Sequence, residues 1–163
     1  MPYELLHSLL PDVAERETRT ITVLPKSSFP LPPAHYSLCE MFCDEPGCDC
    51  RRVMLCVVSS LTQKPEAVIA YGWESREFYV KWFGEDNPSA IKGLLGPVLN
   101  LASPQSRNAP TILDMVRKVV LSDDAYVERV KRHYAMFRAK IGAARPGRAH
   151  QQRKKQKKRK RKA

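Results

Sequence analysis

The cysteines constrain this chain more than any other feature of its sequence. The segment from Cys39 to Cys50, CEMFCDEPGCDC, holds four of the five cysteines, and Cys56 follows closely. Thiolates held this close together repel one another unless a cation lies among them. Zn²⁺ binds Cys sulfur at the corners of a tetrahedron and removes that repulsion. The spacing therefore predicts a zinc-binding loop that organises the fold around it.

Three of these cysteines form the core of the expected ligand set. Cys48 and Cys50 are separated by one residue, so a sharp turn of the backbone lets them share an ion. Cys43 joins them because Pro46-Gly47 allows the chain to reverse direction. The basic residues that follow, Arg51 and Arg52, are expected either to neutralise an anionic zinc centre or to begin a solvated strand.

The fourth ligand depends on the local secondary structure. If Tyr36 to Phe42 forms a helical turn, Cys39 and Cys43 are neighbours, because residues four apart lie on one helix face. If the segment is a strand, their Cα atoms are about 13 Å apart, which is too far to share an ion. Cys39 is the first choice, and the alternatives are His35, Cys56 and His133. Four sulfur ligands close the coordination shell, as in structural zinc sites.

The positive charge of the chain is concentrated at its C-terminus. Residues 142–163 hold eleven Lys and Arg and no acidic residue, while the other 17 Lys and Arg balance the 17 Asp and Glu. The net charge of +11 therefore belongs to this tail. The tail has few apolar side chains whose burial offsets the entropy of ordering, so we expect it to be disordered when free.

A polybasic tail predicts an anionic partner. Each Lys or Arg that neutralises a phosphate releases counterions, so such binding depends little on sequence and falls with salt. We expect RNA or DNA as the partner, although an anionic membrane or a targeting role fits the same composition. The predicted nucleic-acid-binding residues are Arg153, Lys154, Lys155, Lys157, Lys158, Arg159, Lys160, Arg161 and Lys162.

The remaining residues, 1–141, are expected to form a single α+β domain. A small antiparallel sheet carries the zinc loop in a β unit at 35–73, and a helical part follows at 75–141. Apolar and β-branched runs predict a hairpin of strands at 52–59 and 67–73, after an earlier strand at 18–24. Apolar periodicity and capping residues predict the later helices, which include 88–101, 110–121 and a last one that begins after Ser122-Asp123 and ends near Ile141.

The motifs of common enzyme families are absent from the sequence. No phosphate-binding glycine motif, GxSxG elbow or HExxH zinc motif occurs. The first hypothesis is therefore a non-enzymatic zinc protein that binds nucleic acid through its tail. The second is an adaptor that docks a protein partner through helices 110–141, and the third is a metal-dependent enzyme.

The N-terminal residues lack the basic start and long apolar run of a signal peptide. The longest apolar run, Val53 to Val58, is too short to span a membrane. We therefore expect a cytoplasmic protein, or a nuclear one in a eukaryote, where reducing conditions favour metal ligation over disulfides.

Overall fold

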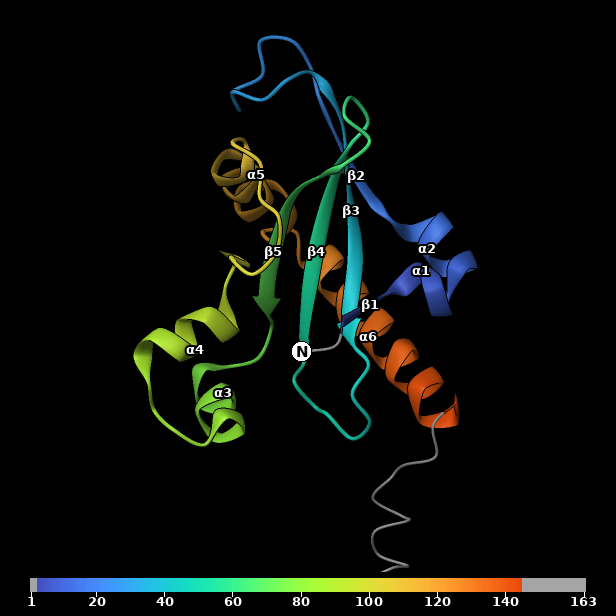
Figure 1. Ribbon diagram of the computed structural model, residues 1–163, viewed down its shortest axis with the longest axis vertical. Coiled ribbons are helices and arrows are strands. Elements are labelled where there is room, and N and C mark those ends of the chain that lie inside the picture. Colours follow the sequence, from blue (N-terminus) through green and yellow to red (C-terminus); the bar gives the residue numbers. More distant parts are fainter. Residues whose placement is uncertain (1–2, 145–163) are drawn as a thin grey trace, which may run out of the picture.

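A central antiparallel sheet is built around three apolar strands, β3 (Ala34–Cys43), β4 (Arg52–Ser59) and β5 (Pro65–Gly72). The computed structural model describes residues 3–144, so the basic residues predicted to bind nucleic acid lie outside the described residues. The strands run antiparallel to their neighbours in sequence (Figure 1). The protein thus has the α+β fold that the sequence predicts.

Shorter elements precede and follow these strands. Before β3 come β1 (Tyr3–Leu5), α1 (Leu6–Leu9), α2 (Pro11–Glu17) and β2 (Arg19–Val23). After β5 come α3 (Arg76–Phe83), α4 (Pro88–Leu95), β6 (Val98–Leu99), α5 (Ala109–Met115), the π-helical segment η1 (Val116–Val120) and the long α6 (Asp124–Ala144). None of the helices within residues 3–144 is both long and apolar enough to cross a membrane.

Two short strands share the outer edge of β3. The sheet runs β1-β3-β4-β5-β6, and β2 also pairs with β3. β2 pairs with residues 34–38 and β1 pairs with residues 41–43, so Cys39 and Glu40 lie between the two paired segments. The helices α1 and α2 connect β1 to β2 beside this part of β3 (Figure 1).

The main core lies between one face of the sheet and the helices α5, η1 and α6. Leu38, Phe42 and Leu55 are fully buried on the sheet side. The ring of Phe42 lies 5.8 Å from that of Tyr134 and 5.5 Å from that of Phe137, both on α6. The apolar positions of the helical part are therefore used largely within the protein's own core, whose helical members include Ile112, Met115, Val116, Val120, Tyr126, Val130 and Ile141.

A histidine and two carboxylates join α6 to β3 and α2. His133 is completely buried, and its Nδ1 lies 2.7 Å from Glu40 Oε2. Its Nε2 contacts Glu17 Oε2, and Glu17 also accepts a hydrogen bond from Arg132 at 2.9 Å. Charge-assisted hydrogen bonds of this kind are stronger than neutral ones.

The same contacts shift two pKa values. Burial alone lowers the pKa of His133, but the hydrogen bonds and charges of Glu40 and Glu17 outweigh it and raise the pKa above its usual 6.5. Hydrogen bonds from Arg132 and His133 lower the pKa of Glu17 from 4.5 to about 2. A protonated His133 between two carboxylates is the arrangement that these shifts favour.

Some predicted elements have other bounds in the structure, and the helix predicted over 110–121 divides into α5 and the π-helical η1. The helix predicted over 88–101 ends at Leu95, because Gly96 has φ 60°, which is outside the helical region. A side chain does not fit at Gly96, since a Cβ there would lie 2.1 Å from the carbonyl oxygen of Ala70. The chain then pairs with β5 as β6. At the other end of the domain, α6 passes the predicted end near Ile141 and continues to Ala144.

Replacing His133 with Ala is expected to lower the free energy of unfolding by about 3 kcal/mol, because Glu40 is then left buried without its cationic partner. Equilibrium denaturation in urea measures this loss. The matched control is His35→Ala, at an exposed histidine that contacts Thr22, which is expected to cost about 0.5 kcal/mol. Equal losses in the two variants would contradict a structural role for the buried histidine.

Candidate metal centre

Three cysteine sulfurs converge where β3 meets the loop that leads to β4. The Sγ atoms of Cys43, Cys48 and Cys50 all lie within 4.8 Å of one another. Sulfurs around one zinc ion are about 3.8 Å apart, because each Zn–S distance is about 2.3 Å and the angles are tetrahedral. The structure thus brings together the three residues that the sequence analysis placed at the core of the ligand set, in a geometry that can hold a metal ion.

A tight turn lets the three sulfurs meet. Gly47 has φ 77°, a conformation that favours glycine, and the N–H of Cys48 donates to the Glu45 carbonyl at 3.2 Å. Cys43 and Cys50 are buried, with exposed fractions of 1% and 0%, whereas Cys48 is partly exposed. The Pro-Gly turn therefore acts as the sequence predicts, and the site lies just beneath the surface.

The backbone of Arg51 is held by two tyrosines from different helices. Its N–H donates to the hydroxyl of Tyr134 on α6 at 3.3 Å, and its carbonyl accepts from the hydroxyl of Tyr79 on α3 at 2.7 Å. These bonds hold Arg51 at φ 47°, a conformation that non-glycine residues seldom adopt. The backbone next to Cys50 is therefore positioned by α3 and α6 together.

The guanidinium groups of Arg51 and Arg52 have other partners than the cysteine sulfurs. Arg51 pairs with Asp49 at 2.9 Å and with Glu74 at 3.1 Å. Arg52 is buried, and it donates to carbonyl oxygens at the end of α4, at 2.9 Å for Leu94 and 3.1 Å for Gly93. Both arginines therefore position the loop and its neighbours. Arg52 begins β4 as a buried residue, so the predicted solvated strand start is wrong for it, whereas neutralisation of a bound metal centre stays a prediction.

A third arginine ties the start of the loop to α6. Arg138 donates to the carbonyl of Cys43 at 2.6 Å and to that of Glu45 at 2.8 Å. Its positive charge also helps to lower the pKa of the Cys43 thiol. The sequence analysis missed this residue, because its contact with the loop spans 95 positions along the chain and no local pattern marks it.

The three thiols are not equivalent electrostatically. A hydrogen bond from the Cys50 thiol, reinforced by the Glu45 backbone N–H and the Cys48 thiol, lowers the pKa of Cys43 from 9.0 to about 6 despite its burial. The hydrogen bond to Cys43 and burial raise the pKa of Cys50, while burial and the charge on Cys43 raise that of Cys48. Cys43 is thus the most acidic thiol of the group, and the other two are the ones whose protons a metal ion has to displace.

The predicted fourth ligand is not part of this group. Residues 36–42 belong to strand β3, so Cys39 is four extended residues from Cys43, and it lies opposite Cys56 of β4. The two histidines considered for the same role have partners of their own, since His35 contacts Thr22 at 2.9 Å and His133 lies between its two carboxylates. Within residues 3–144, Cys43, Cys48 and Cys50 form the one cluster of three or more His, Cys, Asp or Glu with metal-binding spacing.

None of the known protein families, curated proteins or solved structures matches this chain significantly.

Changing Cys48 to Ser is expected to lower metal affinity at least about tenfold, since even residues that only orient metal ligands contribute about 10–100-fold. Elemental analysis of the purified protein measures the bound metal per chain, and Cys43→Ser and Cys50→Ser are expected to behave alike.

Cys39→Ser is the matched control for these variants, because Cys39 lies outside the sulfur group. It is expected to leave the metal content unchanged. Loss of metal from Cys39→Ser, or its full retention in Cys48→Ser, would contradict the assignment of the three ligands.

Proposed function

We propose that this protein is a non-enzymatic zinc-binding protein that associates with nucleic acid through its basic C-terminal tail. The observation that carries the proposal is the convergence of three cysteine sulfurs within 4.8 Å. The distribution of charge supports its second half, because the whole net charge of the chain lies in residues 142–163.

Zinc is the metal that this donor set favours. Thiolate ligands select soft or borderline ions, and Zn²⁺ is the usual metal of cysteine-rich structural sites in small domains. Three thiolates and one Zn²⁺ carry a net charge of −1, and Arg138 places a cation against the loop. A ligand from outside residues 3–144 completes the tetrahedron.

The bound zinc fixes the end of α6 relative to the sheet. The ion joins Cys43, where β3 ends, to Cys50, two residues before β4 begins. Arg138 and Tyr134 attach both sides of this loop to α6. Closing the loop with a metal removes conformations from the unfolded chain and so stabilises the native arrangement. The basic tail follows directly after α6 in the sequence, and zinc thereby fixes the position of its attachment point.

The tail supplies the attraction for nucleic acid. Since the other residues are neutral in total, long-range attraction to phosphates comes from the tail. Its affinity for RNA and DNA depends little on sequence and falls steeply as salt displaces it from the phosphates. The tail thus binds nucleic acid, and it thereby keeps the zinc-stabilised part of the chain attached to it.

Removing residues 145–163, which leaves α6 intact, is expected to abolish most binding to RNA and DNA. The logarithm of the association constant of the full chain is expected to fall with the logarithm of salt concentration, with a slope of about −0.9 for each neutralised phosphate of B-DNA. Fluorescence anisotropy with labelled oligonucleotides at several salt concentrations measures both quantities.

A matched control keeps the tail length and replaces its nine basic residues between Arg153 and Lys162 with Gln. This variant is expected to bind as weakly as the truncated chain. If the truncated chain binds as tightly as the full chain at every salt concentration, the nucleic-acid part of the proposal is wrong.

A metal-dependent enzyme, the third hypothesis from the sequence, is the alternative that the number of ligands favours. Three cysteines rather than four converge within residues 3–144, and catalytic zinc sites keep one position open for water or substrate. The enzyme motifs missing from the sequence argue against it.

Substitution with Co²⁺ separates the two candidates, because its visible and near-ultraviolet absorption reports both thiolate number and geometry. We expect a tetrahedral spectrum with three sulfur ligands that stays the same when small anions or imidazole are added. A spectrum that shifts on such additions reveals an exchangeable position and favours the enzyme.

A further inference from the structure

A second group of sulfur atoms lies on the sheet face opposite the main core. Cys39 pairs directly with Cys56, and two residues along the same strands Met41 pairs with Met54. Successive side chains of a strand point to opposite faces, so residues two apart on each strand share a face. Directly opposite residues have Cβ atoms about 5 Å apart. The register therefore sets two thiols and two thioethers at the corners of one small patch, named here the sulfur quartet.

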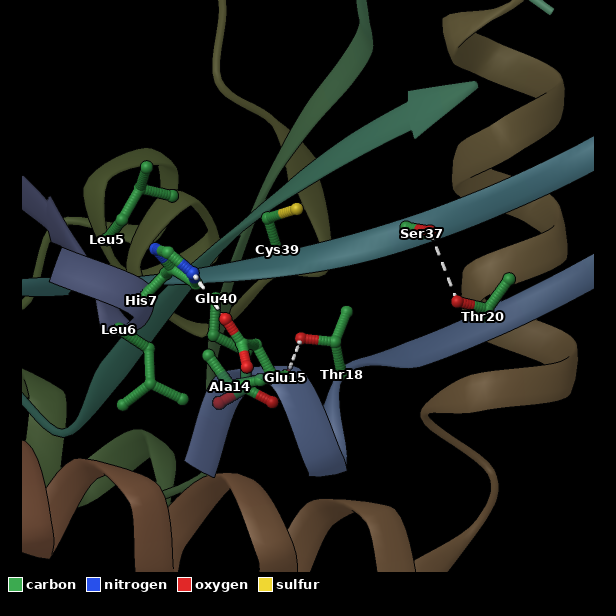
Figure 2. Close-up of a pocket in the computed structure, with 10 residues that line it drawn as sticks. All are labelled: Leu5, Leu6, His7, Ala14, Glu15, Thr18, Thr20, Ser37, Cys39 and Glu40. Atoms are coloured by element: carbon green, nitrogen blue, oxygen red, sulfur yellow. Dashed lines mark hydrogen bonds and ion pairs between the residues drawn. The ribbon is translucent and has the colours of Figure 1, made fainter. Parts of the chain in front are cut away.

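The quartet faces away from the helices that cover the main core. Cys39 and Glu40 leave β3 on opposite sides, and Cys39 projects from the side away from Ala14 (Figure 2). Met41, Met54 and Cys56 pack together in a separate apolar cluster with Val68, Ala70 and Val98. This face is partly open, since Cys39, Met41 and Cys56 are each half-buried.

The geometry points to the quartet as a binding site for Cu(I), with Cys39 and Cys56 as thiolate ligands and Met41 and Met54 as thioether ligands. Thiolate and thioether sulfurs together select a soft ion such as Cu(I), whereas Zn²⁺ takes Cys, His and carboxylate ligands. The thioethers distinguish this site from the cysteine loop, which offers thiols alone. Apolar neighbours around the quartet favour soft ligands over hydrated ones.

The negative charge of a Cu(I) centre in the quartet is balanced by a cation on the same face of the sheet. Each bound Cu⁺ displaces two thiol protons, which pass to solvent, and leaves a centre of net charge −1 because thioethers are neutral. Arg52 lies two residues before Met54 on the same strand, hence on the same face. It is a buried cation whose described hydrogen bonds go to neutral oxygens, those of Tyr3, Gly93 and Leu94.

Two hollows in the surface border the quartet, and one of its residues lines each of them. Cys39 lines one of about 410 Å³ beside α1 and α2 (Figure 2). Met54 lines another of about 510 Å³ beside β6, together with Tyr3 and Arg52. Cys39 and Cys56 are free thiols with side chains on adjacent strands, so no disulfide has to break before the ion binds.

The test is a Cu(I) titration of the reduced, zinc-loaded full chain without oxygen, with the ion supplied as its acetonitrile complex in competition with a coloured Cu(I) chelator. We expect one Cu(I) per chain to be withheld from the chelator, and native mass spectrometry to show zinc retained beside it. The double variant Cys39→Ser, Cys56→Ser is expected to lose this copper. Repeating the titration with Cys48→Ser shows whether the result depends on an intact cysteine loop.

Methionine variants test the site without touching the thiols. The double variant Met41→Leu, Met54→Leu nearly conserves volume, so the fold is expected to survive it. It is expected to lower Cu(I) affinity about tenfold, in the range by which supporting groups tune metal sites. Met115→Leu is the matched control, because Met115 is buried in the main core on the other face of the sheet, and it is expected to change nothing.

Three results would overturn the proposal. One is copper binding that survives in the Cys39→Ser, Cys56→Ser variant, which places the ion in the cysteine loop. Another is equal copper affinity in the Met41→Leu, Met54→Leu variant and the unchanged protein. The third is a reduced protein that withholds no Cu(I) but gains a Cys39–Cys56 disulfide, seen as a loss of two hydrogens by mass spectrometry, when oxidised glutathione is added.

Discussion

The attachment of α6 to β3 is the constraint on which the rest of this fold depends. Apolar packing supplies most of it, through Phe42 against the rings of Tyr134 and Phe137. The buried contact between His133 and Glu40 then selects one position of the helix along the strand. A buried ion pair adds little net stability over apolar packing, but a shifted helix leaves both charges unpaired at a cost of several kcal/mol. Because of that penalty, α6 takes one specific position along β3.

Placement of α6 also determines the geometry of the cysteine loop. With the helix in register, Tyr134 reaches the backbone of Arg51, and one turn later Arg138 reaches the carbonyls of Cys43 and Glu45. The loop is thus organised by side chains that lie more than 80 positions away along the chain. The helix draws the three potential ligands together before any ion binds, which lowers the entropic cost of bringing them to one point.

The sheet separates its sulfur atoms into two environments with different chemistry. At the end of β3, thiols meet in a turn beside backbone N–H groups and arginines, in a geometry that can hold a metal ion. Along the middle of β3 and β4, thiols and thioethers lie in an apolar patch. The difference arises from position along β3. Cys39, Met41 and Cys43 share one face, but Cys39 and Met41 pair with β4, whereas Cys43 ends the strand beside the loop.

Local patterns in the sequence determined a good part of this structure. The apolar, β-branched run at 52–59 predicts β4 with its observed bounds, because a buried central strand needs no information from elsewhere. The short spacing and the Pro-Gly turn similarly predict that Cys43, Cys48 and Cys50 meet, and the composition of the tail locates its charge at once.

Only the tertiary structure decided which residues that are distant in the sequence come into contact. The segment 36–42 is compatible with a helical turn or a strand by its own pattern, and pairing with both neighbours makes it a strand, which removes Cys39 from the loop. The burial of His133 against Glu40, 93 positions away, and the pairing of Cys39 with Cys56 likewise depend on register. Register is a property of two strands or of a strand and a helix together, so one stretch of sequence cannot specify it.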